Sequence, residues 1–229
     1  MKRILVFSLL ACSATFAQQQ QPPAGRALYY FGFLESPPDR PKWSAEESKA
    51  KQAAHLAHIN KMADMGKLVA AGPFVDGGKL RGVFVFKGEN LEEITALANQ
   101  DPLVQANALK LTLHPWWGPP DIGEEYKRMQ KASGGQMQDS MMRAGTCIVR
   151  GDASAWKPGE LTKALLATPK VLAAGAFPGG NDPLGVLVVE AQEAEAVKTL
   201  VSANPAFASG KLTCEFHPWM FAKGTFSKP

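Results

Sequence analysis

The sequence of 229 residues predicts an α+β protein of two tandem ferredoxin-like units whose sheets pair within one chain. Two observations predict this fold. Residues 68–117 align without a gap with residues 171–220, and 15 of the 50 positions are identical. Each copy also has the predicted element order β-α-β-β-α-β, which defines the ferredoxin-like split motif. A period of about a hundred residues that occurs twice indicates duplicated domains rather than a solenoid.

The elements of the first unit follow from apolar runs and turn residues. An aromatic-rich run predicts the first strand, and Ser44 with Glu47 three residues later has the spacing of a capping box at a helix start. Gly66 is typical of the residue after a helix end. The predicted apolar stripe of this helix consists of Leu56, Ile59, Met62, Ala63 and Met65. The predicted strands are 27–34, 67–74, 82–86 and 108–114, and the predicted helices are 44–65 and 91–99.

The second unit repeats this order with a shortened first helix. A separate connector helix over 123–131, ended by two glycines, joins the units. The predicted strands are 145–150, 170–177, 185–190 and 211–217, and the predicted helices are 160–167 and 194–202. The predicted domains are therefore the first unit over 26–120, the connector over 121–143 and a degenerate second unit over 144–229.

A four-stranded sheet with helices on one side leaves its other face apolar. We expect Leu28, Tyr30, Val83 and Val85 to form that face in the first unit. Pairing the two sheets buries both apolar faces. The chain is therefore expected to be an intramolecular pseudo-dimer, and further oligomerisation is not needed to cover the face.

Charge and composition exclude several classes of protein. Lys+Arg 25 against Asp+Glu 21 gives +4, and without Lys2 and Arg3 at the extreme N-terminus the difference is 23 − 21, or +2. No basic excess remains to neutralise phosphates, so no nucleic-acid partner is implied. Apolar residues at 45% and charged residues at 20% exclude a largely disordered chain and a multispan membrane protein.

The first seventeen residues have the layout of a bacterial secretory signal peptide. A basic start precedes the apolar run 4–10, and small residues lead to Ala17. We expect cleavage after Ala17, a secreted or periplasmic protein and a flexible mature N-terminus over 18–25. The run is too short to be a stable membrane span. A lipobox-like sequence ending at Cys12 leaves a lipoprotein as the alternative.

Export affects the expected state of the cysteines. Without Cys12, the mature chain keeps Cys147 and Cys214, on the predicted first and fourth strands of the second unit. These strands are neighbours in the ferredoxin-like order, so a cross-strand disulfide is geometrically possible in an oxidising compartment. Two separate buried thiols are the alternative.

Four short motifs occur in order along the first unit: Ala54-His55-Leu56, the run 66–74, Asp101-Pro102 and His114-Pro115-Trp116. In these motifs the unit resembles the YciI-like (YCII-related) family. It covers residues 26–117 well and residues 144–220 in weaker form. It implies the dimeric α+β barrel superfamily, in which two ferredoxin-like units pack their sheets face to face.

The resemblance also implies a candidate catalytic site at His55 and Asp101. Imidazole titrates near neutrality, and a carboxylate can fix its tautomer and raise its basicity. By superfamily analogy, such a dyad suits isomerisation, elimination or lactone-type hydrolysis of a small organic compound. A non-catalytic small-molecule binding module and a structural barrel remain alternatives. Asp101 can also serve only as a turn residue before Pro102.

No flavin, nicotinamide or metal motif is visible, so no cofactor is expected. A metal pair of His55 and His58 would need further ligands that the sequence does not supply. In the second unit, Asn204 stands in the place of Asp101, and residues 155–168 contain no histidine. The sequence therefore predicts one site in each chain, in the first unit.

Several other residues are predicted to be structural. His114 and His217 occur in both units, including the unit without the dyad. We expect the His-Pro-Trp motifs at strand ends, with Trp116 and Trp219 packing where the units meet. Arg81 could reach an anionic ligand, but a solvated arginine is the default expectation.

Overall fold

The computed structural model describes residues 21–135, 141–157, 160, 164, 171–191 and 193–226. The expected signal peptide, its cleavage site after Ala17 and Cys12 lie outside these residues. So do residues 18–20 of the expected flexible N-terminus, residues 136–140 of the connector and all but Glu160 and Ala164 of the predicted helix 160–167. Within the described ranges, no helix combines the length and the apolar character that crossing a membrane requires.

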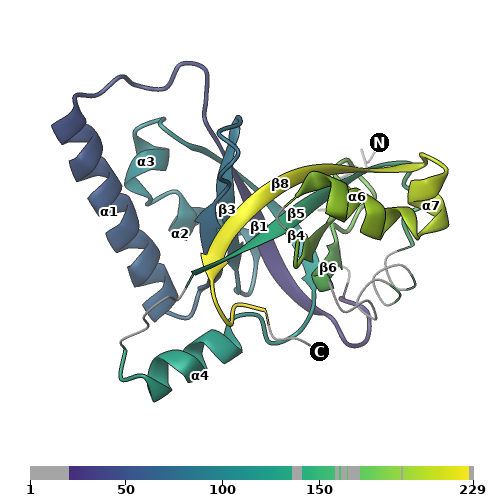
Figure 1. Cartoon of the computed structure of the whole chain (residues 1–229). Helices are drawn as coiled ribbons and strands as arrows, with labels where there is room; N and C mark the ends of the chain where they lie inside the picture. Colours follow the sequence, from purple (N-terminus) through teal and green to yellow (C-terminus); the bar gives the residue numbers. More distant parts are fainter. Residues whose placement is uncertain are drawn as a thin grey trace, which may run out of the picture.

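The chain forms an eight-stranded antiparallel sheet with helices packed against it (Figure 1). The first half contains β1 (Ala27–Glu35), α1 (Ala45–Asp64), β2 (Leu68–Pro73), β3 (Leu80–Phe86), α2 (Leu91–Ala98), α3 (Pro102–Gln105) and β4 (Lys110–Gly118). Helix α4 (Glu124–Ala132) follows. The second half contains β5 (Met141–Gly151), β6 (Val171–Ala176), β7 (Gly185–Val189), α6 (Ala194–Ser202), α7 (Pro205–Ala208) and β8 (Leu212–Ala222).

The strand order in the sheet is β2-β3-β1-β4-β6-β7-β5-β8. The first four strands and the last four therefore follow corresponding orders. Strand β4 pairs with β6 through Trp117 and Ala176, where the two halves of the sheet meet. An isolated bridge between Phe74 and Trp219 brings the end of β2 beside β8, so the two ends of the sheet meet as well.

At each of the two junctions between the halves, a glycine of one half packs against a tryptophan of the other. Trp219 Nε1 donates a hydrogen bond to the carbonyl oxygen of Gly72 at 3.1 Å. A Cβ atom at Gly72 would collide with the carbonyl oxygen of Met220, and one at Gly175 would collide with the indole of Trp116. Because the glycine of each Ala-Ala-Gly segment has no side chain, the tryptophan of the opposite half can pack directly against its backbone. Both indoles are fully buried.

The His-Pro-Trp motifs lie inside their strands, which corrects the expectation that they mark strand ends. Strand β4 continues to Gly118, and β8 continues to Ala222. Trp116 pairs with Tyr29 on β1, and Trp219 pairs with Ala144 on β5. The neighbouring strands extend past the motifs, so ladder pairing continues through them.

A central apolar core fills the space between the two halves of the sheet, and two further cores lie beneath the helices. Val83 and Val85 belong to the central core, as predicted, but Tyr30 and Leu28 face the helices. The register explains this correction, because Tyr30 pairs with Phe86 while Phe31 pairs with Val85. Both faces of β1 are apolar, so alternation of residue types could not identify the inward face.

Helix α1 begins at the predicted capping box. The backbone N–H of Glu47 donates to Ser44 Oγ at 3.2 Å, and the N–H of Ser44 donates to Glu47 Oε2 at 2.9 Å. The predicted apolar stripe is wrong in part, because Leu56 and Met65 are 50% and 52% exposed. The buried face of α1 instead carries His55, His58 and Met62.

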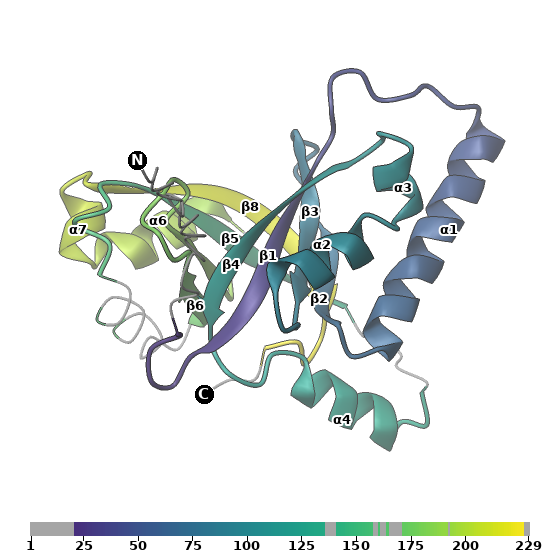
Figure 2. The ribbon, with the colours of Figure 1, turned by 180° about the vertical axis from the view of Figure 1, so that it is seen from behind.

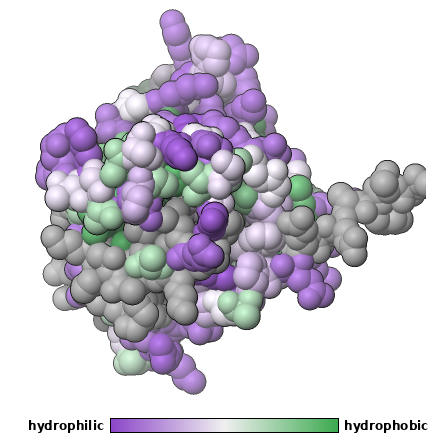
Figure 3. All heavy atoms as spheres, turned by 90° about the vertical axis from the view of Figure 1, so that its right-hand side faces the viewer, coloured by the Kyte–Doolittle hydropathy of each residue, from purple (hydrophilic) through white to green (hydrophobic). Residues whose placement is uncertain are grey.

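The helices of the two halves lie on opposite sides of the sheet. Helices α1, α2 and α3 are on one side, α6 and α7 are on the other, and α4 lies near the C-terminal end of α1 (Figure 2). On the face of the molecule where α6 and α7 lie, hydrophilic and apolar residues are intermixed (Figure 3). His55 on α1 and Asp101 at the start of α3 therefore lie on the side of the first-half helices.

Candidate functional site

Helices α1 and α3 bring His55 and Asp101 together. His55 lies on the buried face of α1, and Asp101 is the N-cap of α3, which packs against α1. His55 Nδ1 and Asp101 Oδ2 are 2.6 Å apart, although 46 residues separate them in the sequence. The side chain of Asp101 is fully buried, and that of His55 is 9% exposed.

Each oxygen of the Asp101 carboxylate has a different partner. Oδ1 accepts hydrogen bonds from the backbone N–H groups of Leu103 at 2.8 Å and Val104 at 3.4 Å. Oδ2 accepts from His55. An ionised carboxylate can only accept, so the proton of a neutral His55 ring lies on Nδ1 and the lone pair lies on Nε2. The turn role and the histidine contact expected for Asp101 therefore coexist.

The His55 ring also forms part of a cleft. It stacks on Phe84 with ring centroids 6.0 Å apart and an interplanar angle of 24°. The cleft has a volume of about 950 Å³, and its lining includes α1, β2, α4 and three residues of the second half, Met141, Ala222 and Thr225. Among the residues that the structure describes, none hydrogen-bonds to Nε2 of His55, which leaves this nitrogen available to a molecule in the cleft.

The cleft is outside the sheet, between it and the first-half helices. The space between the two halves of the sheet is filled by apolar side chains, among them Phe31, Phe33, Trp116 and Phe177. The rings of the three phenylalanines contact one another, with centroids 5.1–6.1 Å apart. A small molecule therefore has room beside His55 rather than in the central core.

His58 has a structural partner. Its Nε2 lies 3.3 Å from the carbonyl oxygen of Leu97, and the residue is 9% exposed. Within the described part of the chain, no group of three or more His, Cys, Asp or Glu side chains is placed to hold a metal ion.

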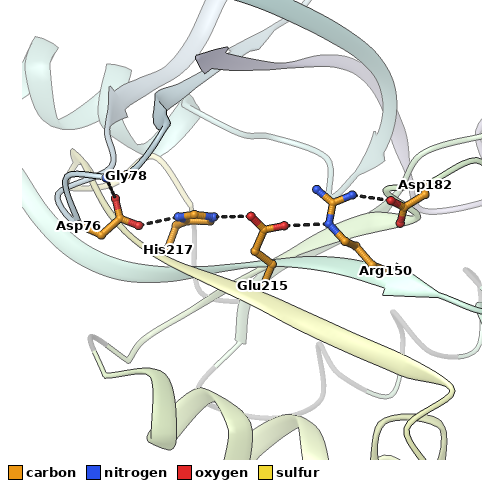
Figure 4. Close-up of polar contacts among 6 residues, drawn as sticks. All are labelled: Asp76, Gly78, Arg150, Asp182, Glu215 and His217. Atoms are coloured by element: carbon orange, nitrogen blue, oxygen red, sulfur yellow. Dashed lines mark hydrogen bonds and ion pairs between the residues drawn. The ribbon is translucent and has the colours of Figure 1, made fainter. Parts of the chain in front are cut away.

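A second polar cluster, which the sequence did not reveal, crosses the junction between the halves (Figure 4). His217 Nδ1 lies 2.6 Å from Asp76 Oδ2, and His217 Nε2 lies 3.1 Å from Glu215 Oε1. Arg150 Nε then donates to Glu215 at 2.8 Å, and its Nη1 donates to Asp182 at 2.5 Å. Asp76 follows β2 in the first half, whereas the other members belong to the second half.

The charges of this cluster reinforce one another. Burial raises the pKa of Asp76, but hydrogen bonds from His217 and from the N–H of Gly78 outweigh it and hold the pKa below its usual value. Burial likewise raises the pKa of Glu215, and the hydrogen bonds from Arg150 and His217 bring it below the usual value. Each ring nitrogen of His217 therefore has a carboxylate oxygen as its hydrogen-bond partner. No nitrogen of His217 remains for a substrate, which distinguishes it from His55.

The corresponding histidine at the other junction has no carboxylate partner among the described residues. His114 packs against Phe177 with ring centroids 4.9 Å apart, as His217 stacks on Phe74 at 4.8 Å. Burial lowers the pKa of His114, which favours its neutral form. The only sequence signal for the Asp76–His217 pair was an acidic residue in the glycine-rich turn after β2.

The remaining predicted site residues have clear positions. Cys147 on β5 and Cys214 on β8 are joined in a disulfide, with Cα atoms 5.2 Å apart. Arg81 is exposed but lines the cleft, where its guanidinium donates to the carbonyl oxygen of Gly78 at 3.4 Å. Asn204 caps α7 with a side-chain oxygen that accepts from the N–H of Ala206 at 2.9 Å.

The antiparallel sheet with helices on its outer faces has the architecture of a dimeric α+β barrel. A chlorite dismutase variant from Candidatus Nitrospira defluvii is similar in structure, with a TM-score of 0.54 and 11% sequence identity. The similarity covers 86% of this chain and 91% of that chain. Residues 33–116, in the first half of the chain, match the family model described as the YCII-related domain. No curated protein matches the chain.

Proposed function

We propose that the protein is an exported enzyme that moves a proton on a small organic compound through His55 and Asp101. The reaction class is isomerisation, elimination or lactone-type hydrolysis. The observation that carries the proposal is the 2.6 Å contact between His55 Nδ1 and Asp101 at the wall of the cleft. Nε2 of His55 accepts a proton from the bound compound, and the buried Asp101 carboxylate stabilises the imidazolium that forms. The imidazolium then returns the proton to another atom of the compound.

The second half supplies an internal comparison for Asp101. Asn204 occupies the equivalent position and caps α7 as Asp101 caps α3. The cap therefore needs only a side-chain oxygen, which an amide provides. The carboxylate of Asp101 adds a charge that the cap does not require, and that charge is directed at His55. This difference supports a chemical role for Asp101 beyond its turn.

The proposal includes two tandem ferredoxin-like units, 26–120 and 144–229, in one chain. The corresponding strand orders of the two halves and the reciprocal glycine–tryptophan contacts support a duplication. The disulfide between Cys147 and Cys214 suits an oxidising compartment and so agrees with export. The second unit, which lacks the histidine and the carboxylate, contributes to the cleft wall.

The test follows proton exchange from a weak carbon acid. The wild-type chain is incubated in deuterated buffer with α-acetyl-γ-butyrolactone, and loss of the α-proton signal is followed by NMR. We expect Asp101→Asn and His55→Gln to slow the enzyme-dependent exchange by about 10²–10⁴-fold, the usual contribution of a positioned acid–base group. His114→Gln, which changes a histidine outside the cleft, should leave the rate unaltered.

Two results would contradict the enzyme proposal. The first is an exchange rate that is the same in wild type and His55→Gln. The second is an Nε2–H tautomer of His55 in the ¹⁵N NMR spectrum of the neutral wild-type protein, because that form leaves no lone pair on the nitrogen proposed as the base. Either result would favour a non-catalytic binding module or a structural barrel.

A further inference from the structure

We infer that the cleft beside His55 binds a small organic anion, with its anionic group at Arg40 and Arg81 and its apolar part against Leu56. This inference rests on the proposed function, because it specifies the kind of molecule on which His55 acts. It is drawn from the charges, the exposed apolar surface and the dimensions of the cleft.

The charged side chains of the cleft lining are mainly cationic. Arg40, Arg81 and Lys127 line it, against one carboxylate, that of Asp64. Lys127 is already paired with Glu124 at 3.0 Å. The two arginines therefore carry the positive charge that is available to a ligand.

Both guanidinium groups have only neutral partners in the described structure. Arg40 donates to Ser36 Oγ at 3.3 Å, and Arg81 donates to the carbonyl oxygen of Gly78 at 3.4 Å. Each guanidinium has five N–H donors, so most of them remain unused. The planar arrangement of these donors matches a carboxylate or a phosphate, to which arginine can donate two parallel hydrogen bonds.

The two arginines approach the cleft from the same end of the sheet. Ser36, whose Oγ accepts from Arg40, donates its backbone N–H to the carbonyl oxygen of Lys79 at 2.9 Å. Lys79 is two residues from Arg81 on the approach to β3. The carboxylate of Glu35, beside Ser36, is engaged by Lys79 Nζ at 2.9 Å. The Glu35 carboxylate is thus paired with Lys79 and does not neutralise either guanidinium group.

Apolar side chains line the cleft beside the dyad. Leu56 is 50% exposed although it is a large apolar residue in the middle of α1, and it lines the cleft next to His55. Phe84, on which His55 stacks, lines the cleft too. An exposed leucine in a concave site favours a ligand with an apolar body over a fully polar one.

The strand geometry limits the length of the ligand. Arg81 and Phe84 are three residues apart on β3, which corresponds to about 10 Å between their Cα atoms. The pairing of β1 with β3 is irregular at Arg81, which lies between the paired residues Leu80 and Gly82, and Arg81 lines the same cleft as Phe84. A compound with one ring or a short chain, carrying an anionic group at one end, has dimensions that suit this separation.

The test compares two probes of the same shape that differ in charge, benzoate and benzamide, by isothermal titration calorimetry on the mature chain. We expect benzoate to bind about tenfold more tightly, the effect of charge-assisted hydrogen bonds to arginine. Arg40→Gln and Arg81→Gln should each weaken benzoate binding about fivefold and leave benzamide binding unchanged. Benzoate affinity should also fall as salt is raised, because salt screens partly exposed charges.

Arg128→Gln is the matched control, because Arg128 lies on α4, pairs with Glu125 and is not among the residues of the cleft wall. It should leave benzoate binding unchanged. Equal affinity for the two probes, no benzoate binding, or equal benzoate binding in the cleft variants and in Arg128→Gln would each overturn the inference. Comparison of benzoate binding with proton exchange in wild type and His55→Gln separates this inference from the proposed function. If benzoate binding depends on the arginines but the exchange rate is the same in wild type and His55→Gln, the anion site stands and the catalytic role of His55 is rejected.

Discussion

The contact between Asp76 and His217 links the two halves, and removing its charge should measurably destabilise the protein. Asp76→Asn is the suitable change, because an amide oxygen can still accept the N–H of Gly78 while the negative charge is lost. The side chains of His217 and Asp76 are only 12% and 26% exposed, so solvent screens their contact less than a surface ion pair. A hydrogen bond to a charged group in such a position contributes about 1.5–3 kcal/mol.

That loss should be visible as a shift of the melting temperature. For a chain of this size, 1 kcal/mol corresponds to about 2–4 °C, so we expect a decrease of about 3–12 °C for Asp76→Asn. Urea unfolding of wild type, Asp76→Asn, His217→Gln and the double variant completes a double-mutant cycle. The coupling free energy should be about 1–2 kcal/mol, less than the whole effect because each substitution also changes the contacts of the other residue.

Acid should remove the difference between wild type and Asp76→Asn. The folded-state pKa values of Asp76 and Glu215 are depressed, so their stabilising contribution is present above the unfolded-state pKa values, about 3.9 and 4.3. The contribution is lost as the pH falls through the lower folded-state values. The gap in unfolding free energy should therefore close below about pH 4.

His114→Gln is the control, because His114 occupies the equivalent place at the other junction and contacts Phe177 rather than a carboxylate. Burial lowers the folded-state pKa of His114, so any change of its effect with pH should begin near the unfolded-state value of about 6.5, above the range in which the Asp76→Asn gap closes. A coupling free energy below about 0.5 kcal/mol would refute the reasoning, because additive sites agree within that margin. So would a gap that stays constant from pH 7 to pH 3.

Three further changes test other parts of the fold. Ser44→Ala removes the capping box and should lower the free energy of unfolding by about 0.5–2 kcal/mol in urea titrations, whereas no change would mean that α1 does not depend on its cap. Gly72→Ala places a methyl group against the carbonyl oxygen of Met220 and should cost about 1–3 kcal/mol. The same change at Gly78, where a Cβ meets only ordinary contacts, should be nearly neutral, and equal effects at the two glycines would contradict the close junction. Reduction of the disulfide should lower the unfolding free energy by about 2–4 kcal/mol, and an identical value with and without reductant would show that the bond contributes nothing.

Local signals predicted the elements that position the site. The capping residues located the start of α1, because a cap depends on neighbouring residues. The family resemblance, rather than a local pattern, indicated His55 and Asp101, which the fold brings within 2.6 Å. The sequence also identified the two strands that carry Cys147 and Cys214, since their order follows from the repeat.

Features that depend on register and on contacts between the halves were not predictable in the same way. Tyr30 faces the helices because β1 pairs with β3 in one particular register, and both faces of β1 are apolar. Leu56 is exposed because α1 turns His55 and His58 inward instead. The Asp76–His217 contact joins residues 141 positions apart, and no local pattern encodes it.

The meeting of β2 with β8 brings the two edge strands of the sheet beside each other. In the part of the chain that the structure describes, each of the eight strands has a neighbour on both sides, at least through a bridge. Unpaired rows of backbone N–H and C=O groups are templates for adding strands from other chains. Separation of the two halves would expose more of these groups on β2 and β8.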